Sequence, residues 1–464
     1  MLTLFDGDRP MRRRELLRVG TLGLGGLALP TLFASAENGS KPGSAEGPLT
    51  GKSVIFLFQQ GGPSQFETFD PKRSTLGGTI PTALPGVHFG AKMAQLAALA
   101  DKFAVVRSFY TGNGGHNIQP IVSKGSFEAS IGVHYSRMAG ATHPMTGMPT
   151  NAVLFPAAID PNLPGPEARG NLSATGPYSS TFAPFVPGGG GQLQEDMKIA
   201  MARERFFGDR RGLLKELDGL NRAADSTGQI EAMDGMQRRA YELLLGGGVS
   251  RALDLSSEDP RTVELYDTSP FALGGERWNK VNRGKKGYYV AQAKSLGKLL
   301  LMARRLCEAG CGFVTIHAGY AGVWDMHADG NNLNMLDGME AVGRSFDHAV
   351  AAFIRDTEAR GLQDRIMLVA TGEMGRTPKL NKRGGRDHWG RLAPLLIYGG
   401  GVAGGQVLGE SDRQGGEPNS EGYGPSHLIS TILRTVLNPG LLRLQPNVPK
   451  QVTELISAPP MPLA

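Results

Sequence analysis

The amino-acid sequence predicts an α/β fold with a central, mostly parallel sheet flanked by helices. The first observation is a set of short, continuous apolar runs, at residues 53–59, 103–109, 312–317, 365–371 and 393–398. Such runs are typical of strands that are buried on both faces. The second observation is that helical patterns over 288–309 and 337–360 alternate with these runs. An alternating α/β series favours parallel strands joined by helices.

Both helical segments are assigned from the spacing of their apolar residues. Leu296 and Leu300 belong to a repeat of three or four residues in the first segment, which Gly310 ends. Val342 and Phe346 belong to the same kind of repeat in the second. Each segment therefore has one face suited to packing against the sheet.

Residues 1–36 read as a twin-arginine export signal. A basic stretch that contains Arg13 and Arg14 precedes an apolar run over 19–33, and Ala34-Ser35-Ala36 has the pattern of a cleavage site. Four glycines make the apolar run only mildly hydrophobic, and no later segment is apolar enough to span a membrane. We therefore expect a periplasmic or extracellular protein without a stable membrane span after signal removal. The alternative is a basic tail on a cytosolic protein.

After a linker over 37–51, residues 52–464 are expected to form one alkaline-phosphatase-like α/β domain. Residues 156–287 read as an insertion or cap, rich in Gly and Pro at first and then helical near 194–222 and 229–246. Loss of residues 1–36 removes five arginines and three acidic residues, so the formal net charge falls from +6 to +4. This weak bias does not indicate nucleic-acid binding, and the sequence predicts no oligomeric state.

The chemistry is expected beyond the carboxyl ends of the strands, where open parallel sheets bind ligands. Asp325 and His327 are two residues apart, so both side chains can reach one cation from an extended segment. Asp387 and His388 are adjacent, and neighbouring glycines allow a loop that turns both inward. Any one of these pairs can instead be a cap or a loop hydrogen bond. Their convergence at one sheet edge favours a metal or anion site.

Mixed carboxylate and imidazole ligands favour a divalent metal. Zinc is the first choice, and manganese or iron suit the same ligands. Calcium stays possible, although calcium and magnesium prefer more oxygen ligands. Two ions about 4 Å apart could polarise an ester and activate water. Arg376 and Arg386 are then expected to bind a phosphate or sulfate group.

Six motifs together resemble an exported bacterial family, the domain of unknown function DUF1501, which is often labelled sulfatase-like. They are Gly61-Gly-Pro-Ser with Thr68-Phe-Asp-Pro, Val106-Arg-Ser108, Trp324-Asp-Met-His327, Thr371-Gly-Glu-Met-Gly-Arg-Thr-Pro378, Gly385-Arg-Asp-His-Trp389 and the glycine-rich stretch 399–409. The resemblance implies a relationship to the alkaline phosphatase and sulfatase superfamily. A mixed sheet, a two-metal site at the strand ends and hydrolysis of a small anionic ester are implied with it.

Carried over residue by residue, the resemblance implies that Asp325 and His327 are metal ligands. Glu373 stands where the superfamily places an acidic ligand after a strand, and Asp387 with His388 resembles a closing pair.

The catalytic group is left open by the sequence. Ser108, Thr111 and Ser64 all lie near the carboxyl edge of the predicted sheet, and His116, on the same loop as Thr111, is a further catalytic candidate. Gln65 and Glu67 stand where the family has His and Asp, which favours the second hypothesis below. The first hypothesis is an exported metal-dependent hydrolase of phosphate or sulfate esters. The second is a non-catalytic cell-surface or partner-binding protein on the same fold.

Overall fold

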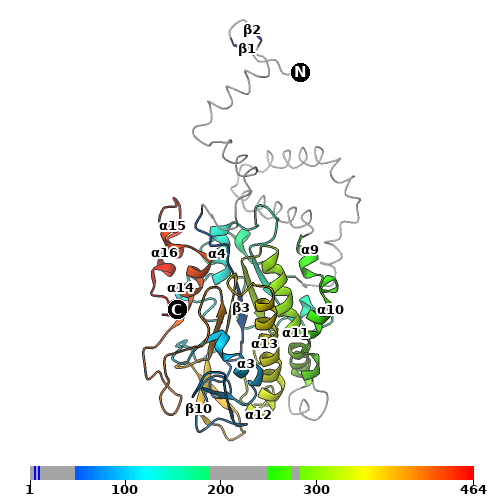
Figure 1. The fold of residues 1–464 in the computed structure, drawn as a ribbon, viewed down its shortest axis with the longest axis vertical. Helices are drawn as coiled ribbons and strands as arrows, with labels where there is room; N and C mark the ends of the chain where they lie inside the picture. Colours follow the sequence, from blue (N-terminus) through cyan, green and yellow to red (C-terminus); the bar gives the residue numbers. More distant parts are fainter. Residues whose placement is uncertain (1–4, 7–8, 11–46, 188–247, 273–282, 464) are drawn as a thin grey trace. The chain divides into compact units, whose positions relative to one another are not determined.

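The computed structural model describes residues 5–6, 9–10, 47–187, 248–272 and 283–463 (Figure 1). The chain divides into two units, Met1–Glu46 and Gly47–Ala464. In the first unit, β1 (Phe5–Asp6) pairs with β2 (Arg9–Pro10) in antiparallel fashion. Most of the predicted export signal and both predicted helical stretches of the insertion, 194–222 and 229–246, lie outside the described residues.

The second unit is built on a seven-stranded sheet with the order β13-β6-β12-β9-β3-β8-β7. In chain order its strands are β3 (Ser53–Phe58), β6 (Phe103–Val106), β7 (Asn151–Leu154), β8 (Phe313–His317), β9 (Ile366–Thr371), β12 (Leu395–Gly399) and β13 (Gln406–Leu408). Strand β3 is parallel to both of its neighbours, β8 and β9. Only β12 runs antiparallel to its two neighbours. The predicted mostly parallel sheet is thus confirmed.

All five strands that the apolar runs predict lie in this sheet. In β3, Val54 and Phe56 face one hydrophobic cluster while Ile55 and Leu57 face another, and none is more than 3% exposed. This alternation is what burial on both faces requires. The apolar runs did not indicate β7 and β13, which are four and three residues long.

Helices cover both faces of the sheet. They are α3 (Ala94–Ala98), α4 (Ile131–Ala139), α9 (Gly248–Leu253), α10 (Pro260–Leu265), α11 (Arg283–Glu308), α12 (Met335–Gly338), α13 (Arg344–Ala359), α14 (Pro425–Val436), α15 (Pro439–Leu442) and α16 (Lys450–Ser457). Buried residues of α3, α11 and α13 pack on one face, and those of α4, α14 and α16 on the other (Figure 1). A π-helical turn, Met339–Gly343, joins α12 to α13, so the predicted second helix continues through a wider turn near its start.

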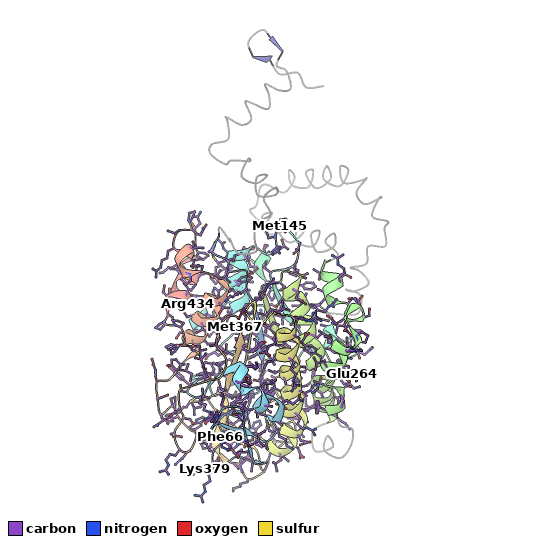
Figure 2. The ribbon with its side chains drawn as sticks, viewed as in Figure 1. Phe66, Met145, Glu264, Met367, Lys379 and Arg434 are labelled. Carbon is purple, nitrogen blue, oxygen red and sulfur yellow. The ribbon has the colours of Figure 1, made fainter. Side chains whose placement is uncertain are left out.

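Loops from the carboxyl ends of the parallel strands gather at one end of this unit. A hairpin of β10 (Gly375–Leu380) and β11 (Arg386–Trp389) lies between β9 and β12 in the chain. A shorter antiparallel pair joins β4 (Thr79–Pro81) and β5 (His88–Gly90). Figure 2 places Phe66 and Lys379 at the end that carries β10 and Met145 at the opposite end. In the described part of the chain, no helix combines the length and apolar character that a membrane span needs.

Candidate metal centre

The centre of the site is the carboxylate of Asp325, which is 4% exposed. Its Oδ2 lies 3.0 Å from Nε2 of His116 and 2.9 Å from Nε2 of His327. Its Oδ1 lies 3.1 Å from Nε2 of His388 and 2.7 Å from a terminal guanidinium nitrogen of Arg376. Asp325 and the three histidines are called the Asp325 cluster below.

Each side chain of the cluster reaches it from a different part of the fold. His116 comes from the loop after β6, and Asp325 and His327 come from the turns after β8. His388 lies in β11, directly opposite Arg376 in β10. Cross-strand partners project from the same face of a hairpin, which explains why His388 and Arg376 meet the same oxygen of Asp325.

Hydrogen bonds at Nδ1 fix the chemistry that two of the rings present at Nε2. Nδ1 of His388 lies 3.0 Å from the carbonyl oxygen of Gly114, and Nδ1 of His116 lies 2.9 Å from Oε1 of Glu373. The carbonyl oxygen of Gly114 can only accept, so Nδ1 of His388 carries the hydrogen. Burial raises the pKa of Glu373, whereas hydrogen bonds from His116 and from the backbone of Gly61 favour its charged form. When Glu373 is ionised, Nδ1 of His116 carries the hydrogen as well. In a neutral imidazole, Nε2 is then an unprotonated acceptor that faces an acceptor oxygen of Asp325. A positive charge, either a proton or a metal ion, must lie between them.

The pKa values report the same demand for positive charge. Burial alone would lower the pKa of His116, but hydrogen bonds and charge attraction from Asp325 and Glu373 raise it to about 9. Burial would raise the pKa of Asp325, yet the Arg376 charge and the three histidines hold it well below its usual range. The cluster is therefore an anionic carboxylate that attracts cations into a ring of imidazole nitrogens.

His116, Asp325 and His388 fit a metal ion. Their ligand atoms all lie within 4.8 Å of one another, and they form the only such group of three or more among the described residues. Two imidazoles and one carboxylate are a donor set that suits zinc, with one position left open. The resemblance implied two ions, and the described residues hold one such group.

Glu373 was expected as a metal ligand, but the structure places it behind His116. Its buried carboxylate contacts Nδ1 of His116 and accepts hydrogen bonds from the backbone N–H of Gly61, at 2.8 Å to Oε1 and 3.1 Å to Oε2. Gly61 has φ +114°, and a Cβ there would lie 2.6 Å from the backbone nitrogen of Asp325. The Gly-Gly turn after β3 thus lets the loop after β8 approach closely. Carboxylates that hold metal-binding histidines in this way raise metal affinity.

The two arginines expected to bind an anion already have other partners. Arg376 is fully buried and donates to backbone oxygens of Gly61, Gly62 and Arg386 as well as to Asp325. Arg386 is fully buried too and pairs with Glu67 at 2.9 Å. Since protein acceptors already bind these guanidinium groups, neither arginine is available for a bidentate contact with the anionic group of a substrate.

Asp387 does not join the cluster. We expected a loop that turns Asp387 and His388 to the same side, but both lie in strand β11. Successive side chains of a strand point to opposite faces, so His388 reaches Asp325 while Asp387 is exposed. Oδ1 of Asp387 instead accepts a hydrogen bond of 3.1 Å from the amide of Asn381.

None of the three candidate hydroxyls contacts the Asp325 cluster in the described structure. Ser108 is fully buried, and a Cβ added to Gly409 would overlap its Oγ. The hydroxyl of Thr111 lies 3.4 Å from the backbone nitrogen of Asn113. Ser64 donates to the carboxylate of Glu67. The hydrogen bonds of the described residues therefore do not single out one of these three hydroxyls as a nucleophile.

Two residues of the site carry no signal in the sequence. Nδ2 of Asn332 lies 3.4 Å from Oδ2 of Asp325, and the buried amide of Gln60 lies 2.8 Å from Nε2 of His317. Both are single amides without a spacing pattern. Burial lowers the pKa of His317 to about 3, so its ring is neutral. Its Nε2 donates the hydrogen bond to the side-chain oxygen of Gln60.

The family comparison agrees with the six motifs. The chain matches the family described as Protein of unknown function (DUF1501) over residues 51–439. This chain belongs to the DUF1501 family. The membership inferred from the six motifs is confirmed, and no protein with a curated function matches the chain at a significant level.

Solved structures with a similar course of the chain include a sulfatase, the protein Ps i-CgsB and a phosphonate monoester hydrolase. The PsFucS1 sulfatase from Pseudoalteromonas sp. is 13% identical, with 92% of this chain and 72% of that chain covered and a TM-score of 0.34. Ps i-CgsB is 9% identical, with 83% and 72% covered and a TM-score of 0.34. Phosphonate monoester hydrolase SpPMH from Silicibacter pomeroyi is 13% identical, with 83% and 73% covered and a TM-score of 0.31. At these TM-scores the likeness carries no argument about the activity of this DUF1501 protein.

Proposed function

We propose that this DUF1501 protein is a metal-dependent hydrolase of phosphate or sulfate esters, with a divalent metal held by His116, Asp325 and His388. The observation that carries the proposal is the meeting of two imidazole nitrogens and the Asp325 carboxylate, whose ligand atoms all lie within 4.8 Å of one another and could hold a metal ion in place of protons. Zinc or manganese suits the two nitrogens and one carboxylate better than calcium, which prefers oxygen. Such an ion supplies Lewis-acid polarisation of an ester oxygen when bound.

The protein's own groups hold this site in shape. Ionised Glu373 accepts a hydrogen bond from Nδ1 of His116, and the carbonyl of Gly114 accepts one from Nδ1 of His388, so both rings present Nε2. Arg376 offsets the negative charge of Asp325 and fixes its Oδ1 from the buried side. His327, whose side chain is 24% exposed, contacts Oδ2 of the same carboxylate.

A matched pair of neighbouring variants tests this proposal. His388→Ala removes a cluster residue, whereas Asp387→Ala changes an exposed residue outside it. The zinc- or manganese-loaded protein is assayed with aryl phosphates, phosphodiesters and aryl sulfates. We expect metal-dependent turnover in the wild type and in Asp387→Ala, and none in His388→Ala. Equal turnover in His388→Ala and Asp387→Ala would contradict the proposal.

A second candidate is a non-catalytic binding protein on the same fold. It is favoured by the three hydroxyls, Ser64, Ser108 and Thr111, none of which is hydrogen-bonded to the cluster in the described structure. Metal binding without turnover on any ester of the panel would support this candidate over the hydrolase.

We also propose export by the twin-arginine route. This route carries folded proteins, which suits a site whose residues come from distant loops. Replacing Arg13-Arg14 by Lys-Lys is expected to leave folded, metal-loaded protein in the cytoplasm. Unchanged export of the Lys-Lys variant would contradict the proposal.

A further inference from the structure

A cavity of about 960 Å³ lies beside the Asp325 cluster. His116 belongs to both the cavity and the cluster, because it lines the cavity while its ring contacts Asp325 and Glu373. A phosphate or sulfate group fills only a small part of such a volume. The remaining space is therefore available to the alcohol portion of an ester whose anionic group sits at the metal.

The lining of the cavity carries an excess of positive charge. Lys124 and Arg169 are both exposed, and neither is paired with a carboxylate within the described part of the chain. Glu128 is the one carboxylate among the lining residues. The other polar groups of the wall are mostly amides, from Asn117, Gln119 and Asn171. Two exposed cations in a concave wall attract anions, while amides bind neutral polar groups.

A buried glutamine, Gln60, connects the loop that carries Arg169 to the loop that carries His116. Gln60 is fully buried, and its Nε2 donates to the backbone oxygens of His116 and Arg169 at 3.0 and 2.8 Å. Its Oε1 accepts from the backbone nitrogen of Arg169 at 3.2 Å and from Nε2 of His317 at 2.8 Å. The loop that carries Arg169 is thereby fixed to the loop that carries His116.

The segment that carries Lys124 is also held in a defined shape. Ser123 and Ser126 form reciprocal side-chain hydrogen bonds around this residue. Phe127 and Glu128 follow with φ values of 56° and 55°, in the left-handed region that residues other than glycine rarely adopt. Two such residues in a row are kept only where the surrounding structure requires them, which is common at binding sites.

We infer that this cavity binds the alcohol portion of the substrate, and that Lys124 and Arg169 bind a second anionic group on it. The preferred substrate class is then an ester whose alcohol carries its own negative charge. This inference rests on the proposed function, because it places the ester group of the same substrate at the Asp325 cluster.

Phosphonates test the inference without turnover, because their C–P bond is not an ester. Binding to the zinc-loaded protein is measured by calorimetry for methylphosphonate and for ω-phosphonocarboxylates with two to six carbons. At least one chain length is expected to bind about tenfold tighter than methylphosphonate, a difference of roughly 1.4 kcal/mol. In Lys124→Ala/Arg169→Ala, this advantage is expected to disappear while methylphosphonate binds as before.

The control is Arg261→Ala/Lys294→Ala, which removes the same two charges from exposed positions outside the cavity. It is expected to keep the advantage. The inference is overturned if no chain length outbinds methylphosphonate in the wild type, or if the Lys124/Arg169 variant keeps the preference. A failure of the proposed function is seen separately, as a protein that binds no metal or as methylphosphonate binding that His388→Ala leaves unchanged.

Discussion

Replacing Asp325 with asparagine removes the charge around which the site is built. The side chain keeps its size, but the fully buried Arg376 loses a charged partner at 2.7 Å. Breaking a buried ion pair on one side costs about 3–5 kcal/mol. Backbone oxygens still accept from Arg376, so we expect the lower end, about 3 kcal/mol, in urea unfolding of the metal-free protein at pH 7.

The pH dependence of this loss has a definite sign. Because the pKa of Asp325 is depressed, its stabilisation is present above the ordinary value of 3.8 and is lost as pH falls further. The stability difference between wild type and Asp325→Asn should therefore shrink in acid. Glu67→Gln is the matched control, since it breaks the buried Arg386 pair away from the cluster. It should be destabilised similarly yet retain metal, whereas Asp325→Asn should lose it. Wild-type stability with full metal content in Asp325→Asn would refute the reasoning.

Three further predictions concern the groups around the cluster. Glu373→Gln should weaken metal binding about 10–100-fold by direct titration, because the Nδ1 partner of His116 loses its charge, and an unchanged affinity would contradict this role. Zinc binding at pH 7 should release about one proton, because the pKa of His116 is about 9 in the metal-free protein and the ligand must be neutral. Affinity should then rise with pH up to about 9, whereas binding heats that do not depend on the buffer would refute the proton release. Gly61→Ala should destabilise the protein by more than about 1 kcal/mol in urea, since φ is +114° there, and wild-type stability would show that the loop adapts.

The sheet could be predicted from the sequence because its information is local. The apolar run of β3 reports burial on both faces without knowledge of its neighbours. The reversed direction of β12 could not be predicted in the same way, since a strand's direction depends on the path of the hairpin β10–β11 before it. Composition gives the strand, and the connection gives its orientation.

The site could be predicted only in part, because its contacts join distant segments. His116 and Asp325 are separated by 209 residues, so no spacing pattern links them, and His116 was predicted as a catalytic group rather than a ligand. The residue type of Arg376 suggested anion binding, but its burial among backbone oxygens is a tertiary property. The glycines near Asp387 suggested a loop, but Asp387 lies in a strand that pairs with β10.

Anomalous diffraction from crystals of the zinc-loaded protein tests the central claim most directly. The account predicts one peak at the zinc absorption edge, between Nε2 of His116, Nε2 of His388 and the carboxylate of Asp325. Crystals of His388→Ala grown in the same way should lose this peak, while those of Asp387→Ala should keep it. A zinc-loaded wild type without a peak at these three side chains, or with its peak at Asp387, would contradict the account.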